Sequence, residues 1–109
     1  MNQAKTCTEK YLEAVRSENY LEADKYYSQL FSESEPPEER IEKMKKLTEV
    51  MGKITSFQLT DSAEKNEGDE SLIMFTYKVN HTKINSVEKF MVMKNEGRYE
   101  ITGHDIKSE

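Results

Sequence analysis

The amino-acid sequence predicts an α+β fold, with three N-terminal helices followed by a four-stranded antiparallel sheet. Two observations favour this class. Hydrophobic residues recur at helical spacing in the first half of the chain and alternate with polar residues after Gly52. Helices and strands that are segregated in this way are typical of α+β proteins and disfavour alternating parallel βαβ units. A chain of 109 residues has room for one hydrophobic core, so residues 1–109 are expected to form a single domain.

The composition excludes several classes of protein. The 16 basic and 21 acidic residues give a net charge of -5, and the lysines are scattered among glutamates. Without a basic stripe, nucleic-acid binding is not expected. The longest apolar runs contain four residues, Leu72–Phe75 and Phe90–Met93, which is too short for a transmembrane helix. Cys7 is the only cysteine, so an internal disulfide or a redox pair is excluded.

The start of the chain bears on its localisation. The first seven residues contain neither an apolar segment nor a small-residue cleavage site, so no targeting signal is expected. The sequence as written therefore favours the cytoplasm. A chain trimmed of its signal would look the same, which keeps the cell envelope and secretion as alternatives.

Three helices are expected in the first half of the chain. Thr6 and Glu9 have the spacing of a capping box, which favours a helix start near Cys7. A proline pair followed by acidic residues suits the start of the third helix, and Gly52 suits the position after its end. The expected helices are Cys7–Arg16, about Leu21–Phe31, and Pro36–Met51.

Four strands are expected after Gly52. In the second strand, Ile73, Phe75 and Tyr77 share one face, whereas Leu72 and Met74 share the other, so both faces are expected to be covered in part. A glycine turn joins the last two strands. The expected strands are Ile54–Ser62, Ser71–Asn80, Val87–Met93 and Arg98–Ile106, with a charged turn over Ala63–Glu70.

Two segments resemble nuclear-transport-factor-2-like domains of the cystatin-like fold group. Tyr11-Leu12-Glu13-Ala14-Val15, before the break that precedes Tyr20, is similar to the opening helix pair, and Gly97-Arg98-Tyr99-Glu100-Ile101-Thr102-Gly103 to the closing hairpin. The order of elements extends the resemblance over almost the whole chain. It implies a cone in which a curved sheet wraps around the helices and leaves a pocket, or a sheet face open for dimerisation. It also points to small bacterial domains of unknown function, which are often secreted or lipid-anchored.

Function does not follow from this fold, whose members include enzymes, transport adaptors and binding modules. We expect a non-enzymatic binding or interaction module that binds a small apolar ligand and has no cofactor. Three short helices can cover only one face of the sheet, so a second copy of the chain is expected to cover the other and form a homodimer. The residues expected to line the pocket, or else to belong to the core, are Tyr11, Tyr27, Phe57, Phe75, Tyr77, Phe90 and Tyr99.

The alternative is an isomerase- or dehydratase-like enzyme that acts on a small apolar substrate by acid-base chemistry. Asp61 or His104 would be the base. Tyr77 or Tyr99 would donate a hydrogen bond to a developing oxyanion. A local turn role explains Asp61 as well. The histidines have no third ligand at a recognisable spacing, so no metal site is expected.

Overall fold

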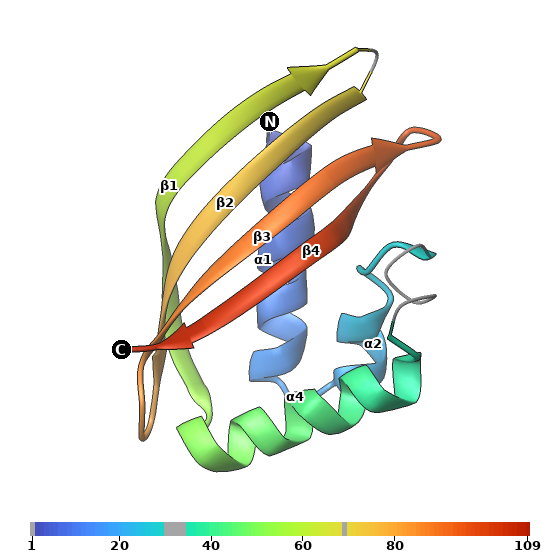
Figure 1. The fold of residues 1–109 in the computed structure, drawn as a ribbon. Helices are drawn as coiled ribbons and strands as arrows, with labels where there is room; N and C mark the ends of the chain where they lie inside the picture. Colours follow the sequence, from blue (N-terminus) through green and yellow to red (C-terminus); the bar gives the residue numbers. More distant parts are fainter. Residues whose placement is uncertain (1, 30–34, 69) are drawn as a thin grey trace.

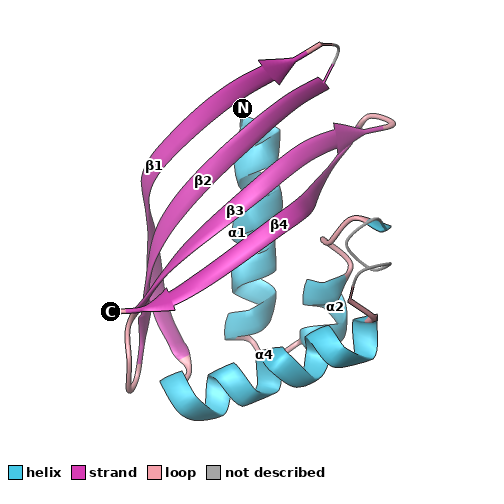
Figure 2. Cartoon of the chain, viewed as in Figure 1, coloured by secondary structure: helices cyan, strands magenta, loops and turns pink. Residues whose placement is uncertain are grey.

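The computed structural model describes residues 2–29, 35–68 and 70–109, and in these ranges it contains three helices and four strands (Figures 1 and 2). The predicted α+β class is confirmed. The helices are α1 (Asn2–Arg16), α2 (Tyr20–Asp24) and α4 (Pro37–Met51). The strands are β1 (Ile54–Glu67), β2 (Glu70–His81), β3 (Ser86–Asn95) and β4 (Arg98–Ser108). No helix of the described residues is long and apolar enough to cross a membrane.

The four strands form one curved antiparallel sheet in the order β1-β2-β3-β4. Figure 1 shows α1 running along one face of this sheet, with α2 and α4 gathered at one end of the molecule. The core lies between α1 and the sheet, because alternate residues of each strand point toward the helix. The largest fully buried apolar side chains are Tyr77, Phe75, Phe90, Leu12 and Ile101.

Helix α1 begins at Asn2 and not at the predicted Cys7. Ala4 is fully buried and lies one helical turn before Thr8, which is also fully buried. The buried face of the helix therefore continues ahead of the expected start. The capping-box residue Thr6 falls inside the helix for this reason.

Helix α2 ends at Asp24, whereas the prediction extended it to Phe31. Instead, Tyr27 forms a parallel bridge with Ile101 of β4, and backbone hydrogen bonds of 2.8 Å join Ile101 to the residues on either side of Tyr27. Strand β4 is an edge strand, so its free backbone groups offer partners that a continued helix would not use. The expected end of the helix, residues 30 and 31, lies outside the described residues.

Strands β1 and β2 are longer than predicted, because the segment expected to be a charged turn forms a ladder. Ala63 pairs with Met74, and Asn66 pairs with Ser71. The β1 side of this ribbon is exposed and polar, so its composition is that of a turn although its backbone is paired. As a result, Asp61 lies within β1 opposite Thr76 and not at a strand end. Strands β3 and β4 contain the predicted segments and extend one or two residues beyond them.

Candidate functional site

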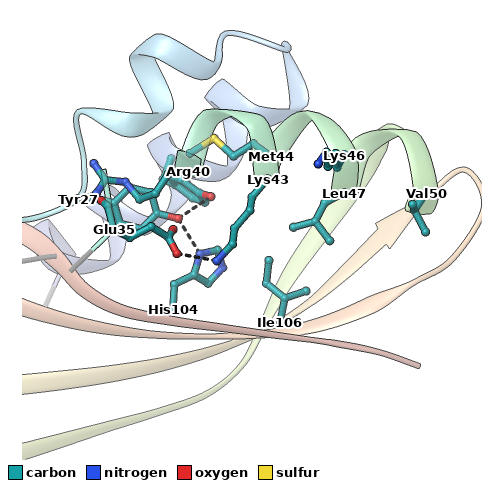
Figure 3. Close-up of a pocket in the computed structure, with 11 residues that line it drawn as sticks. Tyr27, Glu35, Arg40, Lys43, Met44, Lys46, Leu47, Val50, His104 and Ile106 are labelled. Carbon is teal, nitrogen blue, oxygen red and sulfur yellow. Dashed lines mark hydrogen bonds and ion pairs between the residues drawn. The ribbon is translucent and has the colours of Figure 1, made fainter. Parts of the chain in front are cut away.

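An open cavity of about 520 Å³ lies between α4 and β4. Its apolar part is formed by side chains of α4 together with Ile106 of β4 (Figure 3). Its polar end is formed by Tyr11 of α1, Tyr27 after α2, and His104 of β4. The charged residues of the wall are Glu35, Arg40, Lys43 and Lys46. The apolar residues of α4 that line it are Met44, Leu47 and Val50.

A buried ion pair or hydrogen bond between Glu88 and His104 forms the base of the polar end. The Oε1 atom of Glu88 lies 2.7 Å from Nε2 of His104, and the two side chains are 6% and 5% exposed. The residues come from the adjacent strands β3 and β4, and the His104 ring stacks on Phe90 with a centroid separation of 4.2 Å. Because a buried carboxylate is costly without a partner, Nε2–H donates to Glu88 and fixes the orientation of the ring.

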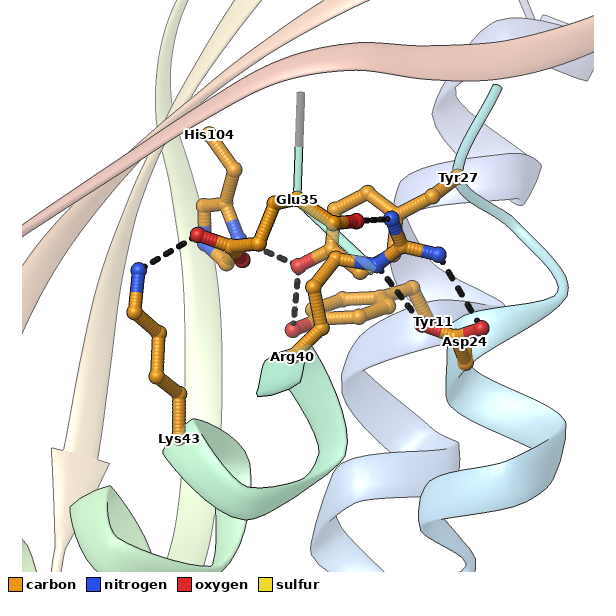
Figure 4. Close-up of polar contacts among 7 residues, drawn as sticks. All are labelled: Tyr11, Asp24, Tyr27, Glu35, Arg40, Lys43 and His104. Atoms are coloured by element: carbon orange, nitrogen blue, oxygen red, sulfur yellow. Dashed lines mark hydrogen bonds and ion pairs between the residues drawn. The ribbon is translucent and has the colours of Figure 1, made fainter. Parts of the chain in front are cut away.

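Two tyrosines continue the chain of hydrogen bonds from His104. The Nδ1 atom of His104 lies 2.8 Å from Oη of Tyr27, and Tyr27 donates to Oη of Tyr11 over 2.9 Å (Figure 4). A phenol has one proton. When the hydroxyl of Tyr27 donates its hydrogen bond to Tyr11, the Nδ1–H group of His104 donates to Tyr27. Both ring nitrogens of His104 then carry a proton, and the ring has a positive charge opposite Glu88. The proton of Tyr11 is then available to an acceptor in the cavity.

Burial keeps both phenols protonated. It raises the pKa of Tyr11 well above its ordinary value, and the neighbouring Tyr27 and the charge of Glu88 add to the effect. The pKa of Tyr27 is also raised, again chiefly by burial. Both side chains are therefore neutral hydrogen-bonding groups over the whole physiological range of pH.

Arg40 of α4 holds Tyr27 at the cavity. Its guanidinium carbon lies 4.9 Å from the centroid of the Tyr27 ring, while Nε and Nη2 donate to the two carboxylate oxygens of Asp24 over 2.7 and 3.1 Å. Nη1 donates to the backbone oxygen of Glu35 over 2.6 Å. Arg40 is 3% exposed, so this fork joins α4, α2 and the Tyr27 segment in a buried contact (Figure 4).

A second branch of polar contacts leads from Glu88 to His81. The Oγ atom of Ser86 donates to Oε2 of Glu88 over 3.5 Å and lies 3.1 Å from Nε2 of His81. The other ring nitrogen of His81 lies 3.1 Å from the backbone oxygen of Gly52. Glu88 therefore connects both histidines, although no group of three or more potential metal ligands occurs in the part of the chain that the structure describes.

The residues predicted to line a pocket are divided by the structure. Tyr11 and Tyr27 lie in the cavity wall. Phe75, Tyr77 and Phe90 are fully buried in the core, and Phe57 packs against it. These six residues and Tyr99 were expected around one pocket, but Tyr99 lines a separate hollow beside α1 and α2.

The residues weighed for catalysis are also separated. His104 lies at the cavity, whereas Asp61 is exposed on β1. The Tyr77 hydroxyl shares a hydrogen bond of 2.8 Å with Thr8, and burial raises the pKa of Tyr77. Its hydroxyl therefore serves contacts between β2 and α1, away from the cavity.

Sequence reasoning missed Glu88 and Arg40. The period of two along β3 places Glu88 on the same face as Phe90 and Val92, and the period of helix α4 places Arg40 in phase with Met44. A charged residue on an apolar face was the available signal in both cases. Such a residue requires a buried partner, which only the tertiary structure supplies.

No protein-family model matches the chain, and no curated protein matches it in sequence. The solved structures that are similar to it include the following two. Bd1075 of Bdellovibrio bacteriovorus matches with a TM-score of 0.63 and 14% identity over 94% of this chain, which spans only 38% of that chain. A Streptomyces avermitilis protein described as a candidate dehydratase of the nuclear-transport-factor-2-like family matches with a TM-score of 0.66 and 11% identity over 99% of this chain and 95% of the other.

The chain therefore has the nuclear-transport-factor-2-like fold, and the resemblance seen in the sequence is confirmed at the level of fold. At these identities the likeness concerns the arrangement of helices and strands alone.

Proposed function

We propose that the chain is a binding module that holds a small, largely apolar molecule in the cavity between α4 and β4. The observation that carries this proposal is the composition of the cavity wall, in which apolar side chains lead to a few converging polar groups. Its volume of about 520 Å³ falls within the range of about 300–1,000 Å³ that is usual for small-molecule sites.

The exposure of α4 supports the same proposal. Leu47 and Val50 line the cavity but remain 36% and 62% exposed, although Met44 on the same helix is buried. An apolar ligand between these side chains and Ile106 would remove apolar surface from water, which is favourable by about 25 cal/mol per Å².

The proposal is tested by titrating the protein with ethylnaphthalene and following its methyl groups by NMR. We expect shifts at Met44, Leu47 and Val50, because these side chains line the cavity. Met74 and Met91 lie on the opposite face of the sheet and serve as internal controls. Equal shifts at both sets of methyl groups, or none at saturation, would contradict the proposal.

A pair of variants separates filling of the cavity from a general effect of a large side chain. Leu47→Trp places an indole in the cavity and is expected to weaken probe binding at least tenfold. Leu21→Trp adds the same group at a site on α2 that is 73% exposed and outside the cavity wall, so binding should not change.

A second candidate function is acid-base catalysis on a small apolar substrate. It is favoured by His104, which Glu88 orients at 2.7 Å beside the hydroxyls of two tyrosines. His104 would take the proton at Nδ1. The protonated ring would then donate to Tyr27 and Tyr27 to Tyr11, which leaves the proton of Tyr11 for the developing oxyanion. The test is exchange of the methyl protons of bound acetylnaphthalene in heavy water. If the chain accelerates this exchange and His104→Gln abolishes the acceleration, catalysis is supported. If exchange proceeds at the rate seen in solvent without protein, the chain binds the molecule but does not catalyse the reaction.

We also propose that two chains associate through the outer face of the sheet. Met74 and Met91 pair across β2 and β3 and are each 38% exposed, and the nearby Leu72 and Met93 are only half-buried. Association through this face would leave the cavity free, because the cavity lies on the side of the sheet that faces α4.

A further inference from the structure

We infer that the ligand is uncharged and carries one hydrogen-bond acceptor, as a ketone or an ester does, and that this acceptor meets the hydroxyl of Tyr11. The inference rests on the proposed binding function and adds the chemical class of the ligand. Two observations carry it: Arg40, Lys43 and His104 of the cavity wall are paired with carboxylates, and the hydrogen bond from Tyr27 leaves the proton of Tyr11 to be donated.

The pairing of charges is the first observation. Arg40 binds Asp24 over 2.7 Å, and Lys43 binds Glu35 over 2.5 Å. His104 lies 2.7 Å from Glu88, so its charge is balanced when the ring is protonated. Among the described residues, the polar end therefore presents no unbalanced positive charge.

This balance disfavours an anionic ligand. A carboxylate moved from water to the polar end would lose its hydration and gain no free cation in return, which costs far more than the transfer of a neutral carbonyl. Lys46 also lines the cavity, but it is exposed. A contact with Lys46 would be screened by water and would contribute little.

The direction of the tyrosine contact is the second observation. Tyr27 donates to Tyr11, whose side chain is 3% exposed and lines the cavity. Apart from Tyr27, no described residue offers an acceptor within hydrogen-bond distance of the Tyr11 hydroxyl. Because burial holds this phenol neutral, it offers a donor to the ligand and no charge. An uncharged acceptor at the end of an apolar ligand would accept the hydrogen bond of the Tyr11 hydroxyl.

Three probes of similar shape test the inference: acetylnaphthalene, ethylnaphthalene and naphthoate. Acetylnaphthalene has a neutral acceptor, ethylnaphthalene has none, and naphthoate has a charged one. We expect acetylnaphthalene to bind about three- to tenfold more tightly than ethylnaphthalene, the value of one net hydrogen bond. Naphthoate should bind more weakly than either.

Tyr11→Phe should abolish the advantage of acetylnaphthalene over ethylnaphthalene and leave the binding of ethylnaphthalene unchanged. The second measurement also reports whether the variant is folded. Tyr20→Phe is the matched control, because Tyr20 likewise bonds to a hydroxyl, that of Thr48 over 3.2 Å, but does not line the cavity. It should retain the preference of the native chain.

Glu35→Gln tests the charge argument by a gain of binding. It leaves Lys43 without a carboxylate partner while preserving the backbone oxygen that accepts from Arg40. Naphthoate should then bind slightly more tightly, because Lys43 is 66% exposed and its attraction is screened by water. Glu42→Gln is the control, because it also removes one negative charge. Glu42 lies on α4 outside the cavity wall, 4.0 Å from Lys45, so this variant should have no such effect.

The outcomes separate the two proposals. If naphthoate binds the native chain as tightly as acetylnaphthalene, or if Tyr11→Phe weakens all three probes equally, the inferred ligand class is wrong while the binding function stands. If none of the three probes binds, the binding function fails and the inference fails with it.

Discussion

Glu88 is a carboxylate on the apolar face of β3, and at the residue scale the polar end of the cavity depends on it. It is buried and is shared between His104 and Ser86. The hydrogen bonds of such a buried acceptor contribute less to stability than its removal would cost, because removal leaves its partners buried and unsatisfied. Its main role in the folded chain is therefore to keep two buried donors satisfied.

Glu88→Leu is expected to lower the free energy of unfolding by about 3 kcal/mol, because it leaves the Nε2–H group of His104 buried without an acceptor. The double variant Glu88→Leu/His104→Leu should recover most of this loss, since both polar groups are then absent. Urea unfolding of the two variants measures the difference. Additive losses in the double variant would show that the two residues are not coupled.

The buried thiol and phenols predict a loss of stability at high pH. Burial raises the pKa of Cys7 from 9.0 to about 11, and it raises the pKa of Tyr11 and Tyr27 as well. Above the pKa of each unfolded group, the folded chain binds more protons than the unfolded chain, so stability falls as pH rises. The stability should keep its full value below pH about 9 and fall progressively as the pH rises further.

Thermal unfolding measured in steps of pH checks this expectation. In Cys7→Ala the fall should begin later, near pH about 10, where unfolded tyrosines ionise. A melting temperature that stays constant from pH about 8 to 11 would contradict the burial of these groups.

At the scale of elements, the junction between α4 and β1 is closely constrained. Gly52 has a φ of 89°, and its amide donates to the backbone oxygen of Thr48 over 2.9 Å. A Cβ atom at this position would lie 2.8 Å from the backbone nitrogen of Lys83 and would also clash with the hydroxyl of Thr82. The predicted role of Gly52 after the third helix thus includes a close approach that the sequence alone does not indicate.

Gly52→Ala should therefore destabilise the chain by about 3 kcal/mol, through backbone strain and the contact with Lys83. Gly97→Ala is the control, because Gly97 has a φ of 81° but open space around it. Strain alone should cost about 1 kcal/mol there. Denaturation of both variants under the same conditions measures the difference, and equal losses would show that the contact does not matter.

The elements that hydrophobic periodicity defines were predicted from the sequence, and those that tertiary contacts define were not. The strand order and the third helix follow from local patterns of Ile, Met and Phe residues. The end of α2 does not, because the bridge between Tyr27 and Ile101 joins residues far apart in the chain.

The candidate site shows the same limit. Tyr11, Tyr27 and His104 stand out in the sequence as aromatic or titratable residues, but nothing in their spacing places them in one chain of hydrogen bonds. Glu88 and Arg40 do not stand out in the sequence, because isolated charges are usually solvated, and their burial depends on partners that folding brings from β4 and α2.

At the scale of the whole molecule, the two sides of the sheet have different proposed roles. The side facing α1 and α4 holds the core and the cavity, whereas the outer side carries Met74 and Met91, each 38% exposed. The exposure of these apolar side chains supports association of two chains through the outer side, and the sequence had suggested the same surface.

Met91→Lys is expected to shift the chain from dimer to monomer. Association through the outer face of the sheet would bury the new lysine charge beside the neighbouring Met74. Sedimentation at high micromolar concentration measures the change. Lys89→Met, on the same strand and exposed, is a control that should not weaken association. A native chain that sediments as a monomer would contradict the proposed dimer.

The crystal structure of the chain with acetylnaphthalene tests the central claim most directly. We expect the naphthyl rings between Leu47 and Ile106, with the ketone oxygen about 3 Å from the hydroxyl of Tyr11. An empty cavity at a saturating concentration of the probe, or a probe bound only on the outer face of the sheet, would contradict the claim that this cavity is a ligand site.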